Sequence, residues 1–252
     1  MSPCAPELLA TSLLAPSSHV CFFQSGQALR SRSVSARVLT ATLDVPAPPA
    51  KVTADWQREV TLHLALVPGD VEALPLARTQ ARWPELRHCV QAMSDWTRTL
   101  GLPPLADCEL ALMACRGAWY HHDGAQYGSA VFANLFLSED RGLDLHFPLT
   151  GQRIPLTRGT AVLFDTCQPH AVIERGATGF DAAHFAPERD CTQLFLTWEL
   201  PIENAGVAQA LQIQFDTDLA AAKQLKEEQV WVIGQPGTVC PASGRWCPAE
   251  TG

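Results

Sequence analysis

Residues 108–200 alternate between apolar and polar side chains over most of their length, and this period of two limits the fold more than any other feature. Turn-forming residues interrupt the alternation at short, even intervals, at Gly124 and in residues 139–142, 150–151, 158–159 and 176–179. Many short strands with even punctuation are typical of a β-sandwich or jelly roll, in which two antiparallel sheets cover each other. The sequence therefore predicts a mainly β protein.

The segments before this region differ from one another in pattern. Residues 1–30 show no clear period and contain Pro, Ser and Gly, so we expect a loosely docked N-terminal arm. Residues 33–45 and 56–67 alternate and are rich in Val, Leu and Thr, which predicts two strands. Residues 31–235 are then expected to form one domain, in which helices support the sheets.

One helix is expected before the strand-rich region, over residues 84–101. Pro84 suits a first helical position, and Gly101 together with the prolines after it suits the end. Apolar residues recur there at helical spacing, at Leu86, Val90, Met93 and Trp96. After the strand-rich region, we expect a helix from about Asp218, a late strand in residues 229–233 and a looped C-terminal tail in residues 236–252.

Composition narrows the class of protein. The chain has 252 residues, of which 47% are hydrophobic and 17% charged, and this balance is typical of a globular domain. Its net charge of -8 and its three lysines argue against a nucleic-acid partner, which requires a basic surface. No apolar run is long enough to span a membrane, and no basic region precedes the short apolar run near Met1, so we expect a cytoplasmic protein.

The nine cysteines do not form a recognisable framework. Their number is odd and none lies in a CxxC motif, so in a reducing compartment we expect most of them to be small buried side chains. Cys240 and Cys247 flank a Pro- and Gly-rich segment, and a disulfide or a zinc site there is a weaker alternative.

The sequence Trp119-Tyr120-His121-His122-Asp123 carries the strongest chemical signal. On an extended backbone His121 and Asp123 point the same way and His122 points the other way. Two imidazoles and one carboxylate bind one face of an octahedral ion, an arrangement that suits non-haem Fe(II) because the other face stays open. His170 is the candidate third ligand. The alternative is that these three side chains only form hydrogen bonds, as single histidines commonly do.

The chain resembles the Fe(II)/2-oxoglutarate-dependent dioxygenases, in which an HxD motif is followed further along the chain by a second His. The resemblance covers roughly residues 105–200 and is strongest in the segments NLFLSED (134–140), GLDLHFP (142–148), RGTAVLFD (158–165) and PHAV (169–172). The chain departs from the family in having Arg141-Gly142 where a pair of glycines is usual.

The resemblance implies a fold and an activity. The fold would be the double-stranded β-helix, a jelly-roll or cupin-like core with flanking helices. His121, Asp123 and His170 would hold Fe(II), and O2 would oxidise a substrate, usually by hydroxylation, while 2-oxoglutarate is decarboxylated to succinate and CO2. The expected substrate is a small molecule such as an amino acid or another metabolite, and a protein or peptide side chain is the alternative.

Two further hypotheses compete with this one. The first is a cupin-type metalloenzyme that binds a metal but does not use 2-oxoglutarate. The second is a non-catalytic β-sandwich used for protein contact, in which the three candidate ligands do not converge. The sequence contains no GxSxG, Walker or GxGxxG motif, so serine hydrolases, P-loop nucleotide hydrolases and Rossmann dehydrogenases lack support.

The far carboxylate of 2-oxoglutarate requires a cation, ideally a guanidinium that binds it with two hydrogen bonds. No lysine lies between Lys51 and Lys223, so an arginine is expected. Arg189 opens the last strand of the region, where the resemblance would place it, and we favour it over Arg175. Arg175 lies at an odd offset from His170 and would point away from it on a continuous strand.

Other side chains are weaker candidates for contact with cosubstrate or substrate. Asn134 is a lone amide in an apolar strand, so it either contacts the cosubstrate or pins a neighbouring strand. Tyr120 and Tyr127 flank the metal motif and either pack or donate a hydroxyl to a ligand. Candidates for the substrate pocket are Arg116, His146, His184 and Trp198, with residues 180–185 as a possible lid.

Overall fold

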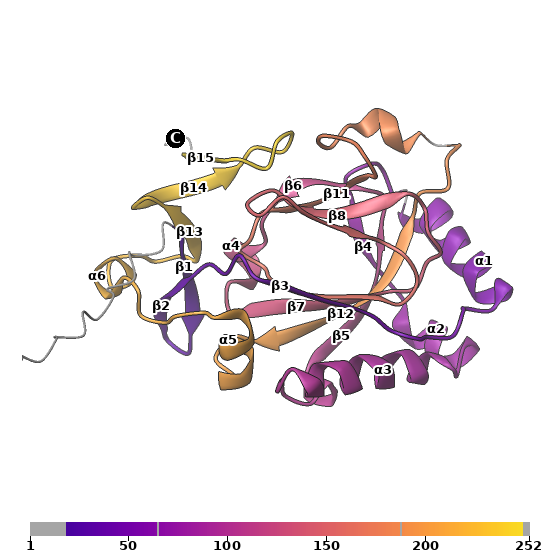
Figure 1. Ribbon diagram of the computed structural model, residues 1–252, viewed down its shortest axis with the longest axis horizontal. Coiled ribbons are helices and arrows are strands. Elements are labelled where there is room, and N and C mark those ends of the chain that lie inside the picture. The colour runs from indigo at the N-terminus through magenta and orange to yellow at the C-terminus, as the bar shows by residue number, and fades with distance from the viewer. Residues whose placement is uncertain (1–18, 65, 187, 249–252) are drawn as a thin grey trace, which may run out of the picture.

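Two antiparallel sheets that face each other form the centre of the computed structural model, which describes residues 19–64, 66–186 and 188–248 (Figure 1). Eight consecutive strands are shared between the sheets, four in each. They are β5 (Glu109–Cys115), β6 (Ala118–His121), β7 (Ala130–Phe136), β8 (Leu143–Phe147), β9 (Gln152–Pro155), β10 (Thr160–Asp165), β11 (His170–Glu174) and β12 (Gln193–Pro201). One sheet has the order β10-β7-β12-β5 and the other β6-β11-β8-β9, which is the double-stranded β-helix topology. The predicted fold class is confirmed.

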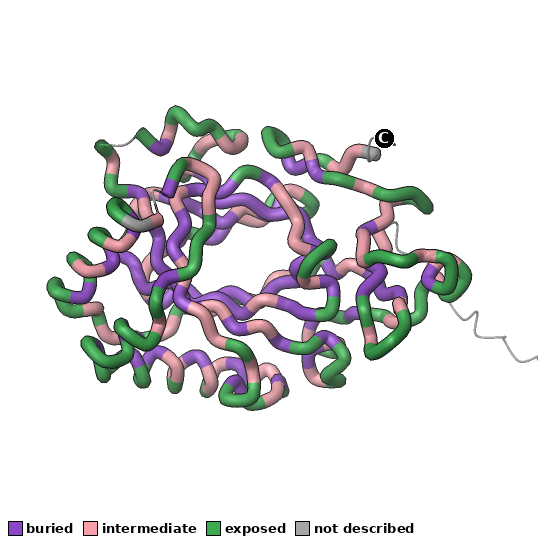
Figure 2. Tube along the Cα trace, turned by 180° about the vertical axis from the view of Figure 1, so that it is seen from behind, coloured by how far each residue is buried: buried purple, intermediate pink, exposed green. Residues whose placement is uncertain are grey.

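Apolar side chains hold the two sheets together. Phe147 on β8 and Phe164 on β10 belong to different sheets, and their rings pack edge to face with 5.3 Å between centroids. Phe136 and Phe195, on neighbouring strands β7 and β12, pack with 5.1 Å between centroids. All four are buried, and buried backbone follows the strands of both sheets in Figure 2. The alternation read from the sequence is therefore the pattern of side chains that point between the sheets.

The first sheet is wider than the second, because β3 (Val38–Thr42) pairs with β10 and β4 (Val71–Leu74) pairs with β5. Helix α3 (Leu86–Thr99) lies along this sheet in Figure 1, as predicted from its apolar spacing. Its buried residues Leu86, Cys89 and Met93 belong to the same core cluster as Trp198 of β12. The helix therefore covers the outer face of the sheet.

The prediction of a strand in residues 56–67 is wrong. Helix α1 (Ala50–Glu59) occupies its first part and continues into a π-helical turn, Val60–Leu64. Val52, Trp56 and Val60 are spaced by four residues and are all buried, so they form one helical face. Val60, Leu62 and Leu64, whose alternation predicted the strand, lie in the π-helical turn that continues this helix.

Both chain ends contribute strands to a third sheet, contrary to the expected arm and looped tail. Its order is β15-β14-β13-β1-β2. The strands are β1 (His19–Ser25), β2 (Ala28–Ser33), β13 (Gln229–Val232), β14 (Gln235–Val239) and β15 (Trp246–Pro248). Cys21, Phe22 and Phe23 are fully buried, which explains why this part of the expected arm is fixed. Residues 1–18 of the arm and 249–252 of the tail lie outside the described residues, whereas the late strand is confirmed as β13.

The remaining helices are short. They are α2 (Leu76–Arg82), α4 (Gly124–Tyr127), α5 (Ala205–Leu211), α6 (Leu219–Ala222) and two 3-10 turns, Leu105–Asp107 and Ala182–Phe185. The helix expected from about Asp218 is confirmed but lasts one turn, with the Asp218 carboxylate accepting from the Ala221 amide. Cys240 and Cys247 are both free thiols.

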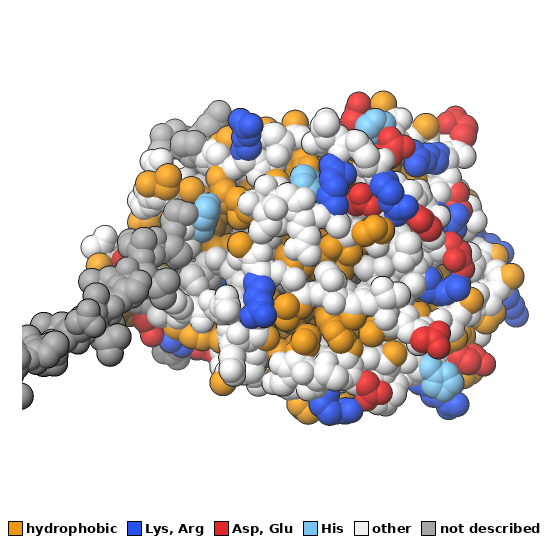
Figure 3. Space-filling view, in the orientation of Figure 1, with side chains coloured by type: hydrophobic (Ala, Val, Ile, Leu, Met, Phe, Trp, Pro, Cys, Tyr) orange, Lys and Arg blue, Asp and Glu red, His pale blue; other side chains and the backbone are white. Residues whose placement is uncertain are grey.

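Helices of the described residues are all too short or too polar to cross a membrane. On the face drawn in Figure 3, basic and acidic side chains are interspersed, and no continuous basic surface of the kind that binds a nucleic-acid backbone is visible.

A fully buried ion pair joins the third sheet to the double-stranded β-helix. Arg32 of β2 donates to both carboxylate oxygens of Asp165, at 2.8 and 2.9 Å, and neither side chain is exposed. The Arg32 Nε also donates to the Gly128 carbonyl at 2.9 Å. Asp165, at the end of β10, accepts from the backbone amides of Ser35 and Cys167. Both charges are thus paired and hydrogen-bonded, as burial requires.

We expect Arg32→Met to lower the free energy of unfolding by about 3–5 kcal/mol, because Asp165 would remain buried without its counter-charge. The double variant Arg32→Met/Asp165→Asn should recover part of this loss. Chemical denaturation measures both. Arg30→Met is the control: Arg30, also on β2, makes exposed ion pairs with Glu203 and Asp216, which contribute about 0–1 kcal/mol. An equal loss in the two arginine variants would contradict the assigned role of the buried pair.

Candidate metal centre

Strand pairing brings His121, Asp123 and His170 together. His121 ends β6, His170 begins β11, and the two residues are directly opposite each other in the antiparallel pair. Their Nε2 atoms lie 3.6 and 3.5 Å from Oδ1 and Oδ2 of Asp123, respectively. One ligand atom from each residue lies within 4.8 Å of the others. The three side chains therefore surround a space that could hold one metal ion.

Backbone carbonyls fix the tautomer of both imidazoles. His121 Nδ1 is 2.7 Å from the Trp119 carbonyl oxygen, and His170 Nδ1 is 2.9 Å from the Gln168 carbonyl oxygen. A carbonyl can only accept, so each Nδ1 must carry the proton and donate it. The lone pair of each ring is then on Nε2, which points towards Asp123. Metal-binding histidines are typically oriented in this way.

The charges at this site favour a bound cation. Burial lowers the pKa of His170 well below its ordinary value, and the neighbouring His121 lowers it further, so the His170 ring is neutral at pH 7. Burial also raises the pKa of Asp123, opposed by the charges of His121 and His122. The half-buried Asp123 carboxylate has no lysine or arginine partner among the described residues. A divalent metal ion would supply the positive charge, so the residues present fit an iron ion.

The backbone around Asp123 is held by the loop after β10. The Asp123 amide donates to the Thr166 carbonyl at 2.8 Å, and the Asp123 carbonyl accepts from the amides of Gln126 and Tyr127 at the start of α4. Gly124 packs so closely that a Cβ there would lie 2.6 Å from the Cys167 Sγ. Only glycine fits this approach, so the turn after the HxD motif is tied to the loop that leads to His170.

A cavity of about 410 Å³ adjoins the three residues. Its apolar wall includes Phe132, Phe136, Phe164 and Phe195. Beyond the three candidate ligands, its polar and acidic residues are Glu109, Gln126, Tyr127, Asn134, Thr197 and Glu199. No lysine or arginine is among the described residues that line it.

Of the three candidates for cosubstrate contact near the motif, two line this cavity. Tyr127 and Asn134 do so, and Asn134 lies opposite Thr197 in the sheet. Tyr120 does not, because it neighbours His121 on β6 and points to the other face. Its hydroxyl is 2.5 Å from Nδ1 of His146, which places His146 outside the cavity as well.

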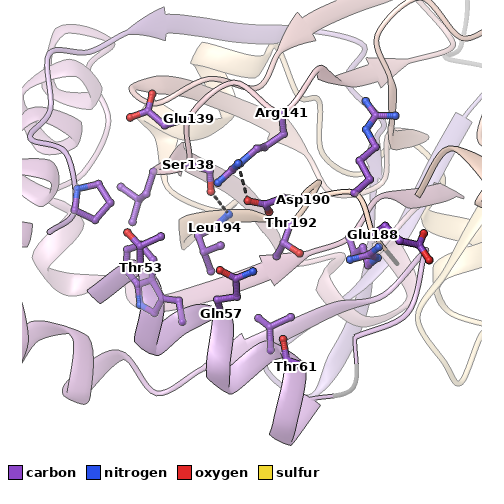
Figure 4. Close-up of a pocket in the computed structure, with 16 residues that line it drawn as sticks. Thr53, Gln57, Thr61, Ser138, Glu139, Arg141, Glu188, Asp190, Thr192 and Leu194 are labelled. Atoms are coloured by element: carbon purple, nitrogen blue, oxygen red, sulfur yellow. Dashed lines mark hydrogen bonds and ion pairs between the residues drawn. The ribbon is translucent and has the colours of Figure 1, made fainter. Parts of the chain in front are cut away.

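Neither arginine proposed as the cosubstrate anchor lines the cavity. Arg189 makes an ion pair with Glu174 and donates to the His184 carbonyl at 3.0 Å. It lines a second cavity of about 250 Å³, between α1 and the segments that precede β12 and follow β7 (Figure 4). Arg175 is engaged by Asp140 and Asp144, each at 2.9 Å. The cation expected for the far carboxylate of 2-oxoglutarate is therefore not brought to the candidate ligands.

The candidates for the substrate pocket also lie elsewhere. Arg116 lines the second cavity and donates to the Phe185 and Ala186 carbonyls. Trp198 is buried against α3, and His184 lies 3.5 Å from Glu174. The expected lid does not line the cavity; the rings of Phe180 and Phe185 stack on each other, and Phe185 is buried.

Two acidic residues that were not predicted from the sequence also line the cavity, Glu109 and Glu199. A usable signal was present. Phe195, Thr197 and Glu199 alternate along β12 and therefore point to the same face. This pattern indicates a charged side chain on the inner face of an otherwise apolar strand. Thr197 was overlooked for the same reason.

Comparison with known proteins gives only distant likenesses. No protein-family model matches the sequence, and no curated protein matches it either. Among solved structures, a prolyl 4-hydroxylase from Pseudomonas putida is 18% identical, with a TM-score of 0.33 over 65% of this chain and 92% of that one.

Two further solved structures are similar at the same level. A Trichoplax adhaerens prolyl hydroxylase, solved with a hypoxia inducible factor peptide, is 14% identical, with a TM-score of 0.38 over 68% of this chain and 86% of that one. The 2-oxoglutarate-dependent epimerase SnoN from nogalamycin biosynthesis is 15% identical, with a TM-score of 0.35 over 75% and 88% of the two chains. Likenesses this distant do not bear on what the present chain binds or does.

Proposed function

We propose that this protein is an Fe(II)- and 2-oxoglutarate-dependent oxygenase whose iron is held by His121, Asp123 and His170. The observation that carries the proposal is the convergence of two imidazole Nε2 atoms and one carboxylate on a single point. Two histidines and one carboxylate with an open side are the ligand set of non-haem Fe(II) oxygenases. A non-catalytic sandwich would have no reason to orient both rings by hydrogen bonds to backbone carbonyls.

The protein's own part in this activity is to position and shield the metal. Trp119 and Gln168 hold the two rings through their carbonyls, and Thr166 fixes the backbone of Asp123. When bound, the iron supplies the activation of O2 for attack on a substrate. Phe147 and Phe164 pack against His170, with 6.2 and 4.8 Å between ring centroids, and keep water from its buried side.

The cavity fits 2-oxoglutarate less well than the triad fits iron. The described lining residues offer neutral donors, among them Thr197 and Gln126, but no cation for the far carboxylate. This observation favours a second candidate function, a metal-dependent enzyme of the cupin kind that does not use 2-oxoglutarate.

The substrate class within the oxygenase proposal is a small molecule such as an amino acid, with a peptide side chain as the alternative. The support is the cavity, whose volume of about 410 Å³ suits a small molecule or a single side chain.

Substitution of each candidate ligand tests the metal site. We expect His121→Ala, Asp123→Ala and His170→Ala each to weaken Fe(II) binding by more than about 100-fold, because altering even the partners of metal ligands costs about 10–100-fold. Anaerobic calorimetric titration measures the affinity. His146→Ala serves as the control, because His146 lies outside the cavity. Wild-type affinity in the three ligand variants would exclude the proposed site.

Turnover of 2-oxoglutarate separates the two candidate functions. Protein purified without oxygen and then given Fe(II), ascorbate, 2-oxoglutarate and air should release succinate if it belongs to the proposed class. Succinate release and Fe(II) absorption spectra are the measurements. Iron binding without any effect of 2-oxoglutarate on the spectrum would favour the cupin kind of enzyme instead.

The same assay tests the arginines. Because Arg189 and Arg175 are engaged outside the cavity, we expect Arg189→Ala and Arg175→Ala to leave the KM for 2-oxoglutarate nearly unchanged. A rise of about tenfold or more, the effect of losing a charge-assisted hydrogen bond, would show instead that the arginine reaches the cosubstrate.

A further inference from the structure

Two glutamates are neighbours on one wall of the cavity. Glu109 on β5 and Glu199 on β12 are directly opposite in the antiparallel register, and both line the cavity of the candidate metal centre. Like charges directly opposite each other destabilise a sheet. Glu199 is half-buried and Glu109 is exposed, so solvent screens only part of this repulsion.

No positive group among the described residues offsets this pair. Neither glutamate makes an ion pair or a side-chain hydrogen bond there, and the described cavity lining contains no lysine or arginine. Burial raises the pKa of Glu199, and the nearby Glu109 raises it further. The iron site cannot compensate both, because Asp123 already uses part of the charge of a divalent ion.

A buried acceptor in the same cavity also lacks a partner. Asn134 is 7% exposed, and its side-chain oxygen is buried without a hydrogen bond. Asn134 lies opposite Thr197 on β12, two residues before Glu199, so the three side chains form one polar band on the inner face of the sheet. A buried amide oxygen is normally hydrogen-bonded. The band therefore needs a ligand that donates hydrogen bonds.

Aromatic rings lie beside the acidic pair and connect it to the metal centre. Phe132 is directly opposite Glu199 in the sheet, and its ring contacts that of Tyr127 with 5.0 Å between centroids. Tyr127 also lines the cavity, and its backbone amide donates to the carbonyl of the candidate metal ligand Asp123 at 2.7 Å. Aromatic faces and carboxylates together are typical of sites for organic cations.

We propose that the substrate carries an ammonium or guanidinium group, which Glu109 and Glu199 bind while the rest of the substrate reaches the metal centre. The role of the metal in this statement rests on the proposed function. Five donors on a guanidinium, or three on an ammonium, match two carboxylates and the Asn134 oxygen. The cation is the side-chain group of a free basic amino acid or of a basic residue in a peptide, since either fits the cavity.

Matched pairs of ligands test the cation requirement. Calorimetric titration of Mn(II)-loaded protein, which avoids oxidation, compares L-arginine with L-citrulline and L-lysine with L-norleucine; in each pair the second molecule lacks the side-chain charge. The same side chains within blocked Gly-X-Gly tripeptides distinguish a peptide from a free amino acid. At least one cation should bind about tenfold or more tightly than its neutral analogue, as a charge-assisted hydrogen bond provides.

Charge-neutral variants locate the binding site. Glu109→Gln/Glu199→Gln should lose the preference for the cation, and each single variant should lose part of it. Glu72→Gln should retain it, because Glu72 lies on β4 between Val71 and Ala73, which line the cavity, and therefore points to the other face of the sheet. Thermal unfolding of each variant confirms that the fold is retained.

Several results would overturn the proposal. The first group concerns the ligands: equal binding of each basic ligand and its analogue without the side-chain charge, an unchanged preference in the double variant, or no binding by any member of the panel. The last is binding of a second equivalent of Mn(II) that is lost in the double variant, which would show that the two glutamates bind a metal ion instead. Failure of the wild type to bind Mn(II) would contradict the proposed function instead. The cation titration is therefore repeated on metal-free protein, where binding of the cation still depends on Glu109 and Glu199.

Discussion

The buried pair of Arg32 and Asp165 is the interaction on which the geometry of the metal centre depends. Asp165 ends β10, and its carboxylate fixes the amide of Cys167 in the loop that leads to His170. Arg32 brings the third sheet against that loop and also holds the carbonyl of Gly128, just after α4. One ion pair therefore restrains both segments that carry the candidate ligands. Removal of its positive half would release the site as well as destabilise the fold.

The fold and the convergence of the three candidate ligands were predictable because they depend on local patterns. Alternation fixes which residues point between the sheets, and an HxD pair on a strand needs only that alternation to aim His121 and Asp123 together. Alternation also misled in residues 56–67, since the apolar residues at positions 60, 62, 64 and 66 alternate as in a strand, whereas Val60–Leu64 is a π-helical turn. The strands at the chain ends depend on pairing between β1 and β13, far apart in the sequence, and no local pattern encodes that pairing.

The placement of the candidate anchor Arg189 could not be predicted, because the loop before β12 decides where this side chain points. Arg189 precedes the strand, and its partners, Glu174 and the His184 carbonyl, draw it away from the cavity. Arg175 follows β11 and is held by Asp140 and Asp144. In both cases a carboxylate from a neighbouring loop satisfies the guanidinium. Such partners are chosen by tertiary packing and cannot be read from the spacing to His170.

The negative charge of the cavity has the same origin, because Arg175 and Arg189 form their ion pairs outside it. With the guanidinium groups paired outside, the inner face keeps Glu109, Glu199 and Asp123, and a divalent ion compensates only part of this negative charge. A positively charged substrate of the kind proposed above would complete the balance. With its cation held by Glu109 and Glu199, the rest of the molecule would be oriented towards the candidate ligands. Positioning of this kind contributes to catalysis by removing the freedom of the reacting groups before the reaction begins.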